Sequence, residues 1–150
     1  MRNGPRSPRA ANYRIGARID IASHQVTGSQ TLTWTNRGKT PVSTLPFHLY
    51  LNAFKNEDSL FLRDSGGEHR GQEASPTGWG WIDGSSITLN GGAGGELRPR
   101  AHYLPPDETV LELPLELPIA PGETVTVDMV FTAQLPEVFS RTGYKGAFTM

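Results

Sequence analysis

The stretch Thr31–Phe54, TLTWTNRGKTPVSTLPFHLYLNAF, decides the fold. Its first part alternates polar residues with Leu32 and Trp34, and it ends in a turn at 36–39, where Asn and Gly adopt positive φ at low cost. Its second part predicts another strand, with His48 and Tyr50 on one face and Leu45, Phe47, Leu49 and Leu51 on the other. Two antiparallel strands with one apolar face each need a second layer to cover them.

Alternation with a period of two recurs near both ends of the chain. Residues 13–21 predict a half-buried strand, with one apolar row made of Tyr13, Ile15, Ala17, Ile19 and Ile21. Residues 110–117 and 124–133 predict two more strands, joined by a type II turn at Pro121-Gly122. Proline lacks a ladder donor, so 110–117 is expected to be an edge strand or to contain a bulge.

The middle of the chain, 55–100, is rich in glycine. Ten of the 17 glycines lie between Gly66 and Gly95, and short strands are expected at 60–63, 79–83 and 86–90. No helical period follows these glycines, which argues against a phosphate-binding loop. We therefore predict an all-β fold, a two-sheet antiparallel β-sandwich with long Gly-rich loops. Residues 1–11 are expected to be a flexible lead-in, and 12–150 a single domain.

The composition excludes several classes of function. The net charge is −1, with 14 basic and 15 acidic residues, so no global field favours nucleic acid or an anionic membrane. Cysteine is absent, which excludes disulfides and thiolate chemistry. No apolar run approaches the roughly 18 residues of a membrane span, and the basic N-terminus has no hydrophobic segment behind it, as a signal peptide would. The location of the protein stays open.

A family resemblance rests on the order of several short motifs. These are Tyr13-x-Ile15 with Ile19-Asp20, then Val26-x-Gly28 with Leu32-x-Trp34-x-Asn36, then Leu45–Asn52, and finally Pro121-Gly122-Glu123 before Val125-x-Val127-x-Met129-x-Phe131. In this order the chain resembles, over about 13–136, the N-terminal domain of M1-family zinc metallopeptidases, which are aminopeptidase-like gluzincins. The resemblance implies a non-catalytic N-terminal domain that packs on the catalytic domain of its own protein and helps to wall the cavity for the peptide substrate.

The same resemblance places the zinc outside this chain. In that family a His-Glu-x-x-His helix and a downstream Glu hold zinc in a separate domain. The chain contains neither this motif nor the family's Gly-Ala-Met-Glu-Asn motif, and its nearest histidines, His48 and His69, are 21 residues apart. We therefore expect no cofactor and no catalytic or metal-binding residue here, and zinc only in the catalytic domain. His69 and Glu73, the nearest candidates for a metal pair, are expected to be solvated or structural.

A few side chains are candidates for contacts with a partner domain or a ligand. His48 and Tyr50 lie opposite the apolar face of their strand, and Tyr144 lies in a glycine-spaced segment, 140–150, that looks unfinished as a domain end. Trp79 and Trp81, one residue apart, would project to the same side of a strand. Such a pair either stacks on a sugar ring or a partner protein, or plugs the end of the sandwich. Arg98 and Arg100 are expected to be solvated.

Two functions from different classes remain open at this point. The first is the accessory domain of an M1-type zinc aminopeptidase. This function predicts an exposed apolar patch, and such a patch would also favour a non-native dimer in isolation. The alternative is a stand-alone carbohydrate- or protein-binding β-sandwich module, for which Trp79 and Trp81 would supply the ligand contacts.

Overall fold

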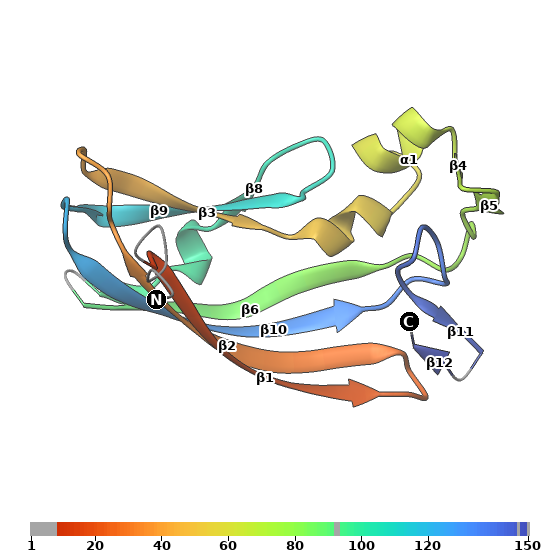
Figure 1. The fold of residues 1–150 in the computed structure, drawn as a ribbon, viewed down its shortest axis with the longest axis horizontal. Coiled ribbons are helices and arrows are strands. Elements are labelled where there is room, and N and C mark those ends of the chain that lie inside the picture. Colours follow the sequence, from red (N-terminus) through yellow and green to blue (C-terminus); the bar gives the residue numbers. More distant parts are fainter. Residues whose placement is uncertain (1–8, 92–93, 147, 150) are drawn as a thin grey trace, which may run out of the picture.

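The computed structural model describes residues 9–91, 94–146 and 148–149, and it forms a sandwich of two antiparallel sheets (Figure 1). The larger sheet has five strands in the order β1 (Ala11–Asp20), β2 (Gln25–Thr35), β10 (Thr124–Gln134), β6 (Trp81–Asn90) and β7 (Gly95–Glu96). The smaller sheet has three, in the order β3 (Val42–His48), β9 (Val110–Ile119) and β8 (His102–Tyr103). The predicted all-β sandwich is confirmed.

Shorter elements lie at one end of the sandwich and along its side. They are the 3₁₀ helices η1 (Tyr50–Phe54) and η2 (Arg98–Arg100), the helix α1 (Leu60–Ser65), and the hairpins β4 (Glu68–His69) with β5 (Gln72–Glu73) and β11 (Tyr144–Lys145) with β12 (Phe148–Thr149). Helix α1 and the β4–β5 hairpin lie at the end to which the C-terminal hairpin also returns (Figure 1).

The core lies between the smaller sheet and the central strands of the larger one. On the larger sheet, Val127 of β10 lies opposite Leu32 of β2 and Leu89 of β6, so three apolar side chains share one face. On the smaller sheet, Leu111 and Leu113 of β9 are fully buried against them. Complete burial of aliphatic side chains of this size contributes about 1.5–3 kcal/mol each.

The strand predicted over the second half of Thr31–Phe54 is only partly right. It ends at His48, and Tyr50–Phe54 forms η1 instead, so Leu49 and Leu51 do not continue the strand face. Asn52 explains the change. It is buried, its amide donates to the Glu108 carbonyl at 2.8 Å and its oxygen accepts from the Ile82 N–H at 2.8 Å, contacts that an extended strand would not place together.

The strand predicted at 60–63 is wrong, because these residues form α1. Ser59 caps the helix by accepting the Leu62 N–H, and Gly66 ends it with φ of 65°. Both are ordinary boundary residues of a short helix. One buried side chain, Leu62, anchors it.

The strands predicted at 79–83 and 86–90 are one strand, β6, with a bulge opposite Val130 and Phe131. Trp79 precedes it, so the two indoles are not strand neighbours as predicted. The cause is Gly80, which is buried and whose N–H donates to the Phe54 carbonyl at 2.8 Å. A Cβ at Gly80 would lie 2.5 Å from the Pro136 ring, so a larger residue does not fit here unless Pro136 shifts.

The proline-containing strand behaves as expected. β9 pairs with β3 through a register shift between Val42 and Thr44, which provides the predicted bulge. The turn that follows it has Gly122 at φ of 83°, and the Glu123 N–H bonds to the Ala120 carbonyl at 3.1 Å. This geometry is that of the predicted Pro-Gly turn.

The half-buried strand predicted at 13–21 is wrong in its burial, although β1 forms. All ten residues of β1 are exposed. The cluster of buried residues that forms the core includes none of them, because the three strands of the smaller sheet pack on the central strands of the larger sheet and leave β1 uncovered. β1 begins at Ala11, and residues 1–8 of the predicted lead-in lie outside the described residues.

Candidate functional site

The residues predicted as contact sites fall in four separate places. His48 ends β3 and Tyr50 begins η1, and their rings stack with centroids 5.1 Å apart and an interplanar angle of 3°. Tyr50 is 73% exposed. The pair therefore presents a small aromatic surface beside the smaller sheet.

Trp79 and Trp81 are both half-buried. Trp79 lies at the end of the sandwich, where with Glu57 and Arg63 it lines a shallow groove of about 320 Å³ next to α1. Trp81 opens β6 and lies opposite Gln134 in the sheet register. The structure thus separates the two indoles, and each belongs to a different surface.

Tyr144 joins the end of the chain to the first hairpin. Its ring stacks on His24, with centroids 3.4 Å apart and an interplanar angle of 5°. His24 lies in the β1–β2 turn with φ of 55°, and its Nε2 is 3.1 Å from the Gly146 carbonyl oxygen. Tyr144 therefore holds the C-terminal hairpin on the larger sheet, while residues 147 and 150 of the predicted unfinished segment lie outside the described residues.

His69 and Glu73 do not form a pair across their hairpin. In the register of β4 and β5, His69 lies opposite Gln72, and Glu73 lies opposite Glu68. The His69 ring packs between Phe61 and Phe139, at centroid distances of 5.7 and 6.3 Å, and its Nδ1 is buried without a hydrogen-bond partner. Across the described ranges, no three His, Asp or Glu side chains gather in a way that would hold a metal ion.

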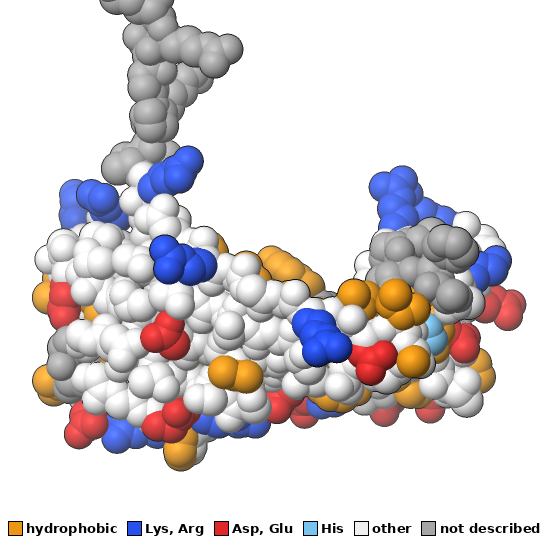
Figure 2. Space-filling model, turned by 90° about the horizontal axis from the view of Figure 1, so that it is seen from below, with side chains coloured by type: hydrophobic (Ala, Val, Ile, Leu, Met, Phe, Trp, Pro, Cys, Tyr) orange, Lys and Arg blue, Asp and Glu red, His pale blue; other side chains and the backbone are white. Residues whose placement is uncertain are grey.

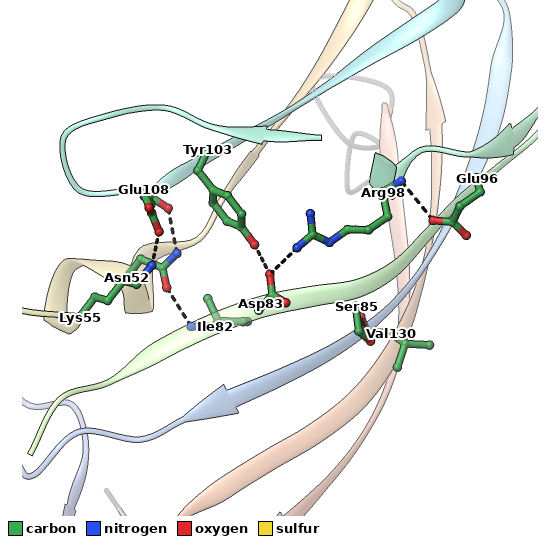
Figure 3. A network of polar contacts seen from close by, with 10 residues as sticks. All are labelled: Asn52, Lys55, Ile82, Asp83, Ser85, Glu96, Arg98, Tyr103, Glu108 and Val130. Carbon is green, nitrogen blue, oxygen red and sulfur yellow. Dashed lines mark hydrogen bonds and ion pairs between the residues drawn. The ribbon is translucent and has the colours of Figure 1, made fainter. Parts of the chain in front are cut away.

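Sequence reasoning missed a polar cluster between the two sheets, centred on Asp83 of β6 (Figure 3). Its carboxylate accepts a hydrogen bond from the Tyr103 hydroxyl and another from Arg98 Nη2, the latter at 3.3 Å. The Arg98 guanidinium also lies 5.8 Å from the centroid of the Tyr103 ring. Burial, followed by the hydrogen bond to Asp83, raises the pKa of Tyr103 to about 12.

A second ion pair, Lys55 with Glu108, lies next to this cluster on the opposite side of the Tyr103 ring (Figure 3). The Arg98 and Arg100 side chains, expected to be solvated, are both paired, Arg100 with Glu116 at 3.1 Å. Asp83 bonds to Arg98 and Tyr103, and Asn52 bonds to the Ile82 N–H. These contacts join β6 to η2, β8 and η1. In the sequence, the only sign of this cluster was the pair of arginines, Arg98 and Arg100. Their carboxylate partners, Asp83 and Glu116, are 15 and 16 residues away, so no local pattern connects them.

A row of exposed apolar side chains lies on β1. Tyr13 and Ile15 are each 59% exposed and Ile19 is 41% exposed; we call these three side chains the open β1 face. Tyr13 lies opposite Leu32, a core residue, so the open β1 face belongs to the same inner side of the larger sheet as the core. The inner side chains of β2, β10 and β6 are covered by the smaller sheet, whereas those of β1 are in contact with water.

The inner side of the sheet next to the open β1 face is shaped by Gly28 of β2. A Cβ there would come within 2.6 Å of the Phe131 ring of β10 and 2.7 Å of the Gly16 carbonyl oxygen of β1. Gly28 therefore lets the Phe131 ring lie flat over β2, toward β1. At the end of the same hairpin, a shallow groove of about 590 Å³ is lined by Ile19, Ile21 and Gln25, among others.

Figure 2 shows the side of the molecule on which β1 and β2 lie, and this side is more polar than the open β1 face. It shows mostly uncharged side chains, with acidic and basic groups scattered and no large patch of one sign. The outward-pointing residues of β2 and β10 are largely hydroxyl-bearing, and Thr31 donates to Asp128 at 2.6 Å. The open β1 face is thus the feature that distinguishes the larger sheet from an ordinary solvated sheet.

Comparisons with known proteins leave the family open. A scan against protein-family models finds no match, and a search of curated proteins finds no matching sequence. Within the described ranges, no helix has the length and apolar character needed to cross a membrane.

Proposed function

We propose that this chain is the accessory N-terminal β-domain of an M1-type zinc aminopeptidase, and that it packs on the catalytic domain without catalysing a reaction itself. The observation that carries the proposal is the open β1 face. Side chains of this size, 41–59% exposed in one row on a well-paired strand, are the mark of a surface that a partner covers. The order of the motifs from Tyr13 to Phe131 supports the family of that partner.

The energetics favour such a partner. Removing apolar surface from water yields about 25 cal/mol per Å², so covering three large side chains would contribute several kcal/mol to domain packing. Interfaces between domains within one chain also combine apolar and polar contacts. Further candidates for such contacts are Tyr144 and the stacked pair of His48 and Tyr50.

Zinc chemistry would lie entirely in the partner domain. There, a His-Glu-x-x-His helix would supply two imidazole ligands, and its Glu would act as general base on water. The four histidines of this chain are held in separate places, and two of them, His24 and His48, stack on tyrosines. The role of this chain would be to position and enclose, forming one wall of the cavity that receives the peptide.

The sequence of the gene and an activity assay of the purified chain test this proposal together. We expect the reading frame beyond the Met150 codon to encode a His-Glu-x-x-His helix, and we expect the isolated chain to hydrolyse no aminoacyl anilide with or without added zinc. A reading frame without that motif would overturn the assignment to a zinc peptidase. Hydrolysis by the isolated chain would overturn its non-catalytic role.

A second candidate function rests on Trp79. Its half-buried indole lines the groove next to α1 together with Glu57 and Arg63, an apolar ring flanked by charged groups that can bond to sugar hydroxyls. A stand-alone binding module would bind a glycan or peptide in an array screen and would lose it on Trp79→Ala. Trp81→Ala serves as the matched control, because the structure places Trp81 on a different surface.

A further inference from the structure

The outer edge of β1 is a second interaction surface, formed by the backbone of the strand and distinct from the inner side of the sheet. β1 ends the five-stranded sheet, and among the described residues it pairs with β2 on one side only. Its ten residues are all exposed. An edge strand of this length presents a row of backbone N–H and C=O groups that can pair with another strand.

We propose that a second copy of this chain occupies this edge, with β1 antiparallel to β1, so that two five-stranded sheets become one continuous sheet. This goes beyond the proposed function, because it uses the strand edge and leaves the inner side of the sheet free for a catalytic domain. Such a two-fold contact is isologous, meaning that each copy contributes the same strand.

The charges of β1 select this partner and one register. Arg14, Arg18 and Asp20 alternate with the apolar row and so lie on the outer side of the sheet, where Arg14 is opposite Thr31 of β2. Asp20 Oδ1 accepts the N–H groups of Ala22 and Ser23 at 2.9 and 3.4 Å, so an ion pair with Arg14 of the other copy would use Oδ2. With the two Ala17 residues at the two-fold axis, Arg14 of each copy lies opposite Asp20 of the other, which makes two equivalent ion pairs. Directly opposed opposite charges favour strand pairing, and opposed like charges disfavour it.

Neighbouring registers lack this match. Placing Gly16 at the axis sets Arg14 against Arg18, and placing Arg18 at the axis sets the two copies of that residue against each other. A pairing shifted by a single residue from the Ala17 register, such as Ala17 opposite Gly16, would bring the apolar row of one copy to the polar side of the other. Only the Ala17 register, among those that pair seven or more residues, both matches the charges and keeps the apolar rows on one side.

The apolar row gains from the same register. Ile15 of one copy lies opposite Ile19 of the other, and Tyr13 lies just beyond the paired residues, beside the turn of the other copy. Aromatic and β-branched residues make favourable cross-strand pairs. The side chains that are 41–59% exposed in one copy therefore meet across the new strand pair as a wider apolar strip.

The chain has no cysteine, so a single introduced thiol reports the register without background. In the proposed dimer the two Ala17 Cα atoms face each other at the 4.5–5.5 Å of an antiparallel pair, a separation that a disulfide spans, by general geometry roughly 4.4–6.8 Å. We expect Ala17→Cys to form a covalent dimer under mild oxidation. Tyr13→Cys is the control, because its own copy lies eight residues away, about 27 Å along the strand.

Sedimentation of the whole chain tests the same contact without covalent chemistry. We expect a monomer–dimer equilibrium whose dissociation constant rises roughly tenfold on Arg14→Asp or on Asp20→Arg and recovers in the doubly reversed variant. Arg37→Asp, an equal change of charge on an exposed turn, should leave it unchanged. A wild-type monomer at every concentration, or equal cross-linking of the two cysteine variants, would overturn the proposal and leave the accessory-domain proposal untouched.

Discussion

At the scale of single residues, Tyr103 shows how the fold alters the chemistry of a side chain. Its phenol lies between the two sheets, donates to Asp83 and is flanked by the cations of Lys55 and Arg98. Burial and the acceptor carboxylate both favour the neutral phenol over the phenolate. The residue therefore links the stability of the sandwich to pH in the alkaline range.

The free energy of unfolding should therefore depend on Tyr103 at alkaline pH. The folded-state pKa of Tyr103, about 12, is above the ordinary value of 10.0, so its stabilising contribution is complete below pH 10 and is lost as the pH rises through 12. Tyr103→Phe should remove this alkaline loss and lower the free energy of unfolding at neutral pH by about 1 kcal/mol, since one hydrogen bond is lost. Urea titrations at several pH values measure both effects, with Tyr13→Phe as the exposed control. Identical alkaline slopes in wild type and Tyr103→Phe would contradict it.

The second prediction concerns Glu96 of β7. Its carboxylate accepts the Ile87 N–H at 2.9 Å and the Arg98 N–H at 3.1 Å, and these bonds, the first most strongly, lower the pKa of Glu96 below 4.5. Its stabilising contribution is present above that ordinary value and is lost as the pH falls through the lowered one. Glu96→Gln should therefore flatten the acid limb of the stability curve, measured by thermal unfolding from pH 7 to pH 3. Glu123→Gln is a comparison on the turn, and an unchanged acid limb in Glu96→Gln would refute the assignment.

At the scale of elements, two glycines in the first hairpin have opposite constraints. Gly28 is crowded by the Phe131 ring and the Gly16 carbonyl, whereas a Cβ at Gly16 would meet nothing within 4 Å. We expect Gly28→Ala to lower the free energy of unfolding by about 1–3 kcal/mol, because the ring or the β1–β2 pairing must shift. Gly16→Ala, the matched control, should be neutral or slightly stabilising, since it restricts the unfolded chain. Chemical denaturation of both variants measures this, and equal effects would show that the Phe131 packing is not the constraint.

The elements also show what the sequence predicts well and where it fails. Alternation located β1, β2, β9 and β10, because period-two patterning and Pro-Gly turn chemistry are local signals. The end of β3 was missed because Asn52 bonds to Glu108 and Ile82, which are distant in sequence. Helix α1 was missed, and a strand was predicted at Leu60–Arg63, because an apolar run of this length fits either a strand or a helix. Capping by Ser59 and Gly66 decides in favour of the helix.

The candidate sites were harder to predict than the strands, for a related reason. Aromatic residues could be singled out by type, but their partners, such as His24 for Tyr144, are far away in the chain. The burial of β1 was also wrongly predicted. Its apolar row fits a strand with one covered side, but among the described residues the smaller sheet packs on the central strands and does not reach it.

At the scale of the whole molecule, we propose that a catalytic domain packs on the inner side of the larger sheet, at β1. A titration of this chain with the zinc domain that we expect the same gene to encode, expressed separately, followed by hydrogen exchange of the complex, tests this most directly. We expect saturable binding that protects the backbone amides of β1 beyond their protection in the chain alone at the same concentration. We also expect a loss of affinity of at least tenfold for Ile15→Arg, which leaves a charge at a desolvated contact. Val130→Arg, an equally exposed apolar position on the other side of the sheet, should bind as wild type does. Absence of binding, or protection confined to the hydroxyl-bearing side while β1 exchanges freely, would contradict the account.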